Sequence, residues 1–215
     1  MPGSYIVAGA RTPIGKMSGA LADLSAADLG GFAIAEAMRR ANVQPDEVEH
    51  VIVGQVLMAG QGQVPARQAA AKAGIPMHVP SVNVNKVCLS GLNSIYLADQ
   101  MIQNGEADIV VAGGMENMDL APYLLPSGRW GSRMGDATLY DSMLHDGLND
   151  AFSGQHSGWH TEDLAAKYGV TRADQDRFAA QSHQRAAHAT KEGWFKAEIV
   201  PLSAEKIGQK TGCDA

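Results

Sequence analysis

The sequence predicts an α/β fold in which a mostly parallel, layered sheet is covered by helices. Short apolar runs alternate with helical patterns over residues 4–118, and this alternation is the one that builds parallel sheets. Two Ser/Thr residues with Asp three positions later are capping boxes that mark helix starts. Apolar residues make up 45% of the 215 residues and charged residues 19%, which is ordinary for a globular protein with a buried core. We expect an α/β domain over residues 1–118 and a second unit over residues 119–215.

The elements of the first unit follow from local patterns. Short apolar or valine-rich runs predict strands at residues 5–8, 48–57, 81–84 and 107–112. Helical spacing predicts helices at residues 26–41, 64–73 and 89–103. Ser25 and Asp28 form the capping box of the first helix, and Gly74 follows the second.

The second unit begins with a long irregular segment. Residues 119–155 contain five glycines and no sustained period, and such a segment inside a compact protein is usually functional. Helices are expected at residues 158–168 and 171–191, the latter with a capping box from Thr171 and Asp174. Residues 197–202 are strand-like, and residues 203–215 show no period and are expected to be frayed.

Composition restricts the classes of partner. The net charge of −6 and the scattered Lys and Arg residues argue against a nucleic-acid partner. No apolar run approaches the roughly 20 residues that span a bilayer, and Met1-Pro2-Gly3-Ser4 opens into an apolar run without a signal peptide. The two cysteines, Cys88 and Cys213, form neither a disulfide framework nor a metal-binding spacing. We expect a cytoplasmic protein with reduced thiols and no bound metal.

Cys88 is the candidate nucleophile. It falls between an expected strand and the expected helix at 89–103, where the partial positive charge of a helix N-terminus favours the reactive thiolate. Unpaired N–H groups at such a position can also hold an oxyanion when a thioester carbonyl is attacked. The pattern alone leaves a second reading open, since an isolated cysteine is often a small buried apolar residue.

Several ordered motifs extend this pattern. The nucleophile segment, Asn85 to Leu92, resembles the Asn-x-x-Cys-x-Ser-Gly segment of the thiolase family. Further similar segments lie in family order, at residues 7–15, 65–69, 112–118, 146–148 and 156–158. The resemblance covers residues 5 to about 202. A ketoacyl synthase, which also has a cysteine at a strand–helix junction, is the nearest rival, and the segments around Glu116 and His156 favour thiolase.

The resemblance implies a function. Cys88 would take an acyl group from an acyl-CoA, with its own backbone N–H helping to hold the oxyanion. Leu148 and His156 correspond to family positions that contact coenzyme A, which is a substrate, so no separate cofactor is expected. The segment after Met118 corresponds to the family's loop domain, and a homo-oligomer, a dimer or a tetramer, is implied. Leu89 stands where many relatives have Gly or Ser, which leaves the preferred acyl chain length open.

Other family segments do not occur in the 215 residues. These are the Gly-His-Pro, Cys-x-Gly and Asn-Glu-Ala-Phe segments that supply acid–base chemistry and hold a water in the family's second half. Cys213 lies in a different context and is not expected to replace the second thiol. We therefore expect one of the family's two α/β repeats, inactive alone, and a non-catalytic or split subunit that assembles with a complementary thiolase half is the alternative.

Overall fold

The computed structural model of the protein describes residues 3–208 and consists of a sheet-and-helix core and a long arm. The core has a three-stranded parallel sheet in the order β2-β1-β3, formed by Ser81–Val84, His50–Gly54 and Val110–Gly114. Its helices are α1 (Ala26–Ala41), α2 (Pro65–Lys72) and α3 (Ser90–Gln103), and the 3-10 helix η1 (Pro45–Glu47) precedes β1. The predicted α/β class and its layered parallel sheet are confirmed.

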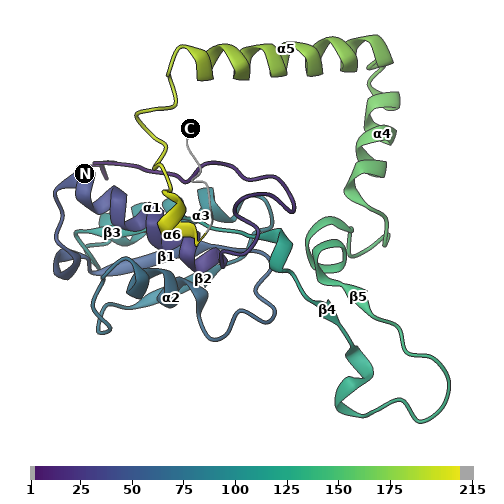
Figure 1. Ribbon diagram of the computed structural model, residues 1–215, viewed down its shortest axis with the longest axis horizontal. Helices are drawn as coiled ribbons and strands as arrows, with labels where there is room; N and C mark the ends of the chain where they lie inside the picture. The colour runs from purple at the N-terminus through teal and green to yellow at the C-terminus, as the bar shows by residue number, and fades with distance from the viewer. Residues whose placement is uncertain (1–2, 209–215) are drawn as a thin grey trace.

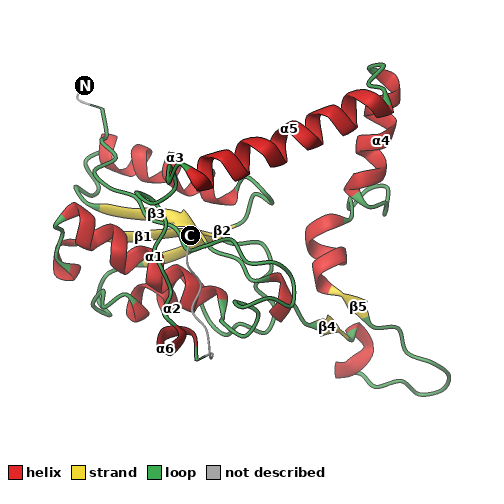
Figure 2. Ribbon diagram, turned by 45° about the horizontal axis from the view of Figure 1, so that its top comes forward, coloured by secondary structure: helices red, strands yellow, loops and turns green. Residues whose placement is uncertain are grey.

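The strand order explains why helices cover both faces of the sheet. The chain moves from β1 to β2 in one direction and then back past β1 to β3, so the right-handed crossovers α2 and α3 lie on opposite faces. Val51 and Val53 belong to the core cluster shared with α1 and α2. Gly54 faces the start of α3. The central strand β1 is thus buried on both sides (Figure 2).

The helix ends are capped both by neighbouring side chains and by side chains distant in sequence. The predicted capping box of α1 is confirmed, with Ser25 and Asp28 each accepting the other's backbone N–H. Helix α2 follows Val64, which has no capping oxygen. Instead, the Asn83 side chain on β2 accepts the N–H of Ala66 at 2.8 Å. This cap ties α2 to the sheet.

The arm leaves the core after β3 (Figure 1). It contains the antiparallel pair β4 (Tyr123–Leu124) and β5 (Tyr140–Asp141), followed by α4 (Ser157–Lys167) and α5 (Arg172–Lys191). Two 3-10 helices, η2 (Met118–Leu120) and η3 (Pro126–Arg129), and the π-helix η4 (Met143–Leu148) complete it. Both long helices are close to their predicted ranges, and the capping box at Thr171 is confirmed. Of the α5 residues only Ala189 is buried, and Figure 1 shows this helix running back above the core, separated from the sheet.

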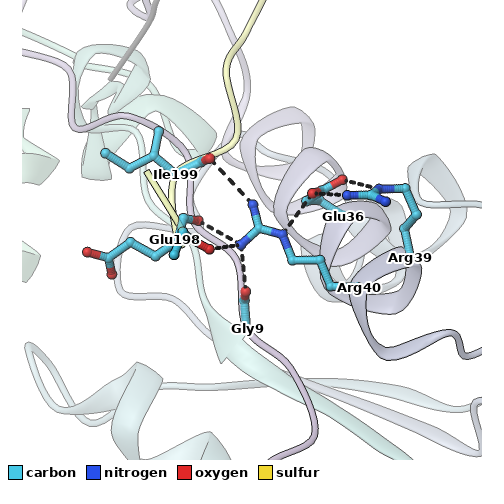
Figure 3. A network of polar contacts seen from close by, with 7 residues as sticks. Gly9, Glu36, Arg39, Arg40, Glu198 and Ile199 are labelled. Atoms are coloured by element: carbon cyan, nitrogen blue, oxygen red, sulfur yellow. Dashed lines mark hydrogen bonds and ion pairs between the residues drawn. The ribbon is translucent and has the colours of Figure 1, made fainter. Parts of the chain in front are cut away.

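The chain then returns and packs on α1. Val200, Leu202 and Ile207 form a cluster with Leu21, and Arg11 forms an isolated parallel bridge with Ile199. Arg40 holds both segments to α1 (Figure 3): its guanidinium donates to the carbonyl oxygens of Gly9, Ala197, Glu198 and Ile199 and to the Glu36 carboxylate. We call this set of contacts the Arg40 clasp.

Several predicted elements differ from the structure. The strand expected at residues 5–8 is wrong, because the segment has no neighbouring strand and Tyr5, Ile6 and Val7 are exposed. The strand expected at 197–202 is also wrong, since it is reduced to isolated bridge positions at Ile199 and Leu202. Residues 203–208, expected to be frayed, contain the short helix α6 (Ala204–Ile207), capped by Ser203. The second half of the expected tail, including Cys213, lies outside the described residues.

Candidate active site

The candidate active site lies at the carboxyl edge of the parallel sheet. A cavity of about 410 Å³ is lined by residues from the segments that follow the three strands, namely Gly54–Leu57, residues 87–91 except Leu89 and residues 114–118 except Asn117, and by Gly147 and Leu148 from the arm. In open parallel sheets, ligands bind outside the carboxyl ends of the strands, where the connections diverge to opposite faces. The sheet topology therefore brings these three loops to one cavity.

Cys88 lines this cavity and is exposed. It follows β2 and precedes α3, which begins at Ser90. The reading of Cys88 as a buried apolar residue is thus wrong. Within the part of the chain that the structure describes, its backbone N–H donates to no protein group. Cys88 therefore brings a thiol to the cavity together with a backbone N–H that has no partner among the described residues, and thioester attack requires both a nucleophile and such a donor.

The turn that presents Cys88 is strained. Val87 has a φ of 49°, in the left-handed region that costs an L-residue roughly 1–2 kcal/mol. The Asn85 Oδ1 accepts the Val87 N–H at 3.0 Å. The Ser90 hydroxyl accepts the Lys86 N–H at 2.8 Å and donates to the Val87 carbonyl at 2.6 Å. Two side chains thus hold the turn from both ends.

Glycines let α3 approach the sheet closely. A Cβ on Gly54 would lie 2.3 Å from the Ser90 carbonyl carbon, and one on Gly114 would lie 3.1 Å from the Gly91 Cα. Side chains at these positions would push the first turn of α3, and Cys88 with it, away from the strand ends. The small residues of the Ala112–Met118 and Ser90–Gly91 segments thereby fix the position of the thiol.

Glu116 connects the loops that surround Cys88. Its carboxylate accepts the N–H of Val56 at 2.8 Å and that of Leu57 at 3.4 Å. The Val56 carbonyl in turn accepts from the Asn85 side-chain amide at 3.4 Å. Burial raises the pKa of the Glu116 carboxyl above its usual range, opposed by the two N–H groups. Glu116 and Cys88 are the two ionisable residues among those that line the cavity.

The structure separates the two predicted coenzyme A contacts. Leu148, at the end of η4, lines the Cys88 cavity. His156 does not line it: the His156 Nδ1 accepts the Gly158 N–H at 3.0 Å and caps α4. Both assignments stay predictions.

Asn85 and Ser90 belong to the nucleophile motif, but sequence reasoning assigned them no positioning role. The one available signal was an Asn two positions before a residue in a tight turn, the spacing of an Asx turn.

Residues 3–208 contain no group of three His, Cys, Asp or Glu side chains arranged to hold a metal ion. None of the helices described combines the length and the apolar character needed to cross a membrane.

The fold and the site together define an α/β protein that presents a cysteine from a strand–turn–helix unit at the carboxyl edge of a parallel sheet. The family description "Thiolase, N-terminal domain" matches residues 4–214, and the chain belongs to the thiolase family.

Similar proteins with curated names support this family assignment. A "Probable acetyl-CoA acetyltransferase" of Mycolicibacterium smegmatis is 56% identical over 96% of this chain and 53% of its own length. An "Acetyl-CoA acetyltransferase" of Pseudomonas aeruginosa is 49% identical over 97% of this chain and 53% of its own. A "Probable acetyl-CoA acyltransferase" of Staphylococcus aureus is 50% identical over 96% of this chain and 52% of its own. The chain spans about half the length of these relatives.

Proposed function

We propose that this chain carries the acyl-accepting part of an acetyl-CoA acetyltransferase. The Cys88 thiolate attacks the carbonyl carbon of an acyl-CoA, a new carbon–sulfur bond forms, the bond to the coenzyme A sulfur breaks, and the released thiolate takes up a proton. The observation that carries the proposal is the exposed Cys88 on a cavity at the carboxyl edge of the sheet, within a family match over residues 4–214. The Cys88 N–H, which has no partner among the described residues, supports stabilisation of the oxyanion.

The substrate is an acyl-CoA thioester, and coenzyme A enters as a substrate rather than as a resident cofactor. Leu148 supports this proposal, because this apolar residue of the arm lines the same cavity as Cys88. His156 is part of the same proposal through its position in the family motif. Such chemistry fits a cytoplasmic protein of fatty-acid metabolism.

We expect the chain to accept an acyl group on Cys88 but not to catalyse repeated turnover. General acid–base assistance is typically worth about 10²–10⁴ in rate per group, and Glu116, the other ionisable residue of the cavity, is engaged by two backbone N–H groups. Acyl transfer onto Cys88 needs only a thiolate and a nearby thioester, so that single step survives.

The experiment combines two measurements on the same protein. Intact mass after incubation with acetyl-CoA should show one acetyl group on the wild type and none on Cys88→Ala. Thiolysis of acetoacetyl-CoA by the 215-residue chain should show no sustained turnover. An unmodified wild type would contradict the proposal, and turnover abolished by Cys88→Ala would show that this chain contains its own acid–base residues.

A partner is part of the proposal. The outer face of α3 exposes Leu92, Ile95 and Tyr96, and isolated monomers rarely leave large contiguous apolar patches uncovered. We propose that this face is covered either by a second copy, in a dimer or a tetramer, or by a complementary thiolase half. The non-catalytic subunit remains the second candidate, favoured by the absence of histidine from the residues that line the cavity.

A further inference from the structure

The direction of the Cys88 thiol depends on the backbone of its turn. Within the described residues, the Cys88 side chain makes no hydrogen bond that would orient it. Its neighbour Val87 is β-branched and has a φ of 49°, a conformation that such residues leave unless their surroundings hold them there. Whatever holds Val87 therefore also sets where the thiol lies.

The Ser90 hydroxyl is placed to hold this turn. It accepts the Lys86 N–H at 2.8 Å and donates to the Val87 carbonyl at 2.6 Å. One oxygen thus bridges the residue before Val87 and Val87 itself. Ser90 is 4% exposed, so water does not compete freely for either bond.

The first turn of α3 gives Ser90 a fixed base. The backbone of Ser90 packs directly against Gly54, at a distance that leaves no room for a Cβ. The Ser90 N–H also donates to the Val87 carbonyl, at 3.0 Å. Because Ser90 cannot shift towards the sheet, its hydroxyl holds the turn at a fixed position relative to the sheet edge.

We propose that the Ser90 hydroxyl is a positioning group for Cys88: it keeps Val87 in the left-handed conformation and so keeps the thiol on the cavity. This inference rests on the proposed function, in which Cys88 is the nucleophile. Ser90 acts through the backbone of the turn and takes no part in proton transfer.

Ser94 provides a matched control, one turn further along α3. It is completely buried, and its hydroxyl oxygen lies 2.7 and 2.8 Å from the carbonyl oxygens of Gly91 and Gly113, which share its single O–H proton. Replacing either serine by alanine removes one buried hydroxyl from the same helix. Only the change at Ser90 removes a contact to the Cys88 turn.

The experiment measures alkylation of Cys88 by iodoacetamide from pH 6 to pH 10 in the wild type, Ser90→Ala and Ser94→Ala, with mass mapping of the labelled peptide and circular dichroism to verify folding. At neutral pH, Ser90→Ala should react about tenfold more slowly, because a released turn no longer holds the thiol exposed on the cavity, and the reactivity of a cysteine depends on its exposure and surroundings. Ser94→Ala should stay within about twofold of the wild type although it loses comparable hydrogen bonds.

Two results would overturn the inference. One is a folded Ser90→Ala variant that reacts as fast as the wild type across the pH range. The other is an equal loss in both variants, which would make the effect one of general destabilisation. A wild type no more reactive than a cysteine in an unfolded peptide would instead remove the proposed function, and the inference with it.

A second measurement uses only the wild-type protein, so it tests the inference even if Ser90→Ala does not fold. In the wild type, the amide hydrogens of Lys86 and Val87 have acceptors in Ser90 and Asn85, whereas that of Cys88 has none among the described residues. Hydrogen exchange at Lys86 and Val87 should be at least about tenfold slower than at Cys88. Equal exchange at the three amides would show that the hydroxyl does not hold the turn.

Discussion

At the residue scale, the site consists of a thiol and the groups that fix its turn. The Asn-x-x-Cys-x-Ser-Gly pattern predicted where Cys88 falls in the fold, because a strand–helix junction can be read from neighbouring residues. It did not predict the left-handed Val87, since a β-branched residue avoids that region in isolation. The short-range side-chain contacts of Asn85 and Ser90 hold Val87 in this region, and no helix or strand period indicates such contacts.

Val87→Gly should change the free energy of unfolding by less than about 1 kcal/mol. Glycine removes a backbone strain of roughly 1–2 kcal/mol, and this gain offsets its entropic cost of about 0.5–1 kcal/mol and the loss of a half-exposed side chain. Val53→Gly in β1 is the matched control: Val53 is buried, so its loss should cost about 3 kcal/mol or more. Urea unfolding of both variants tests this, and similar costs at the two positions would show that Val87 is not strained.

At the scale of elements, prediction succeeded where a signal is local and failed where a partner is needed. The capping boxes of α1 and α5 were predicted because all their groups lie within four residues. The apolar run at residues 5–8 forms no strand because a strand requires a neighbour. The Asn83 cap of α2 and the Arg40 clasp join residues far apart in sequence, so no local pattern indicates them.

The Arg40 clasp should anchor the end of the arm. Arg40→Ala removes donors to four carbonyl groups as well as the bond to Glu36, whereas Arg39→Ala removes only an exposed pair with Glu36. We expect a loss of about 1–3 kcal/mol for Arg40→Ala and less than about 1 kcal/mol for Arg39→Ala. In Arg40→Ala, the amides of Arg11 and Val200, which pair the two segments, should exchange faster. If the amides of Arg11 and Val200 exchanged at the same rate in both variants, Arg40 would not anchor the end of the arm.

Glu36 makes part of this stability depend on pH. Hydrogen bonds from Arg39, and then from Arg40, lower the pKa of the Glu36 carboxyl from 4.5 to about 2 in the folded protein. Since the folded-state pKa is depressed, the contribution is complete above about pH 4.5 and is lost as the pH falls towards 2. The stability difference between wild type and Glu36→Gln should therefore be constant near neutral pH and shrink below about pH 4.5.

Urea midpoints measured from pH 7 to pH 2.5 would show this trend. Glu106→Gln serves as the control, because Glu106 is exposed and forms no ion pair among the described residues. A wild-type advantage over Glu36→Gln that persists at the acid end would exclude Glu36 as its source.

At the scale of the whole molecule, the family resemblance predicted a parallel sheet with helices and a loop segment, and the fold class is confirmed. The division at residue 118 stays a prediction. After the arm, the chain packs again on α1 through Val200 and Leu202, which composition alone does not show. The course of the arm depends on where its two ends attach. One attachment is the Arg40 clasp, and the other is Asn117, whose side-chain amide donates to the Leu21 carbonyl.

The last prediction concerns the uncovered face of α3. Leu92 is 64% exposed and Tyr96 58% exposed. Burying this surface against a second copy removes apolar area from water, at roughly 25 cal/mol per Å². We therefore expect the purified chain to associate as its concentration rises.

Leu92→Lys should shift this association to higher concentration, because pairing would bury a charge on the apolar face. Met77→Lys is the matched control: Met77 is also exposed, at 71%, but lies between α2 and β2, away from α3. Sedimentation velocity over a range of concentrations, at equal ionic strength for all three proteins, separates the cases. A wild type that stays monomeric throughout would exclude self-association through this face and leave a complementary thiolase half as its proposed partner. Equal effects of the two lysines would instead place the contact elsewhere on the molecule.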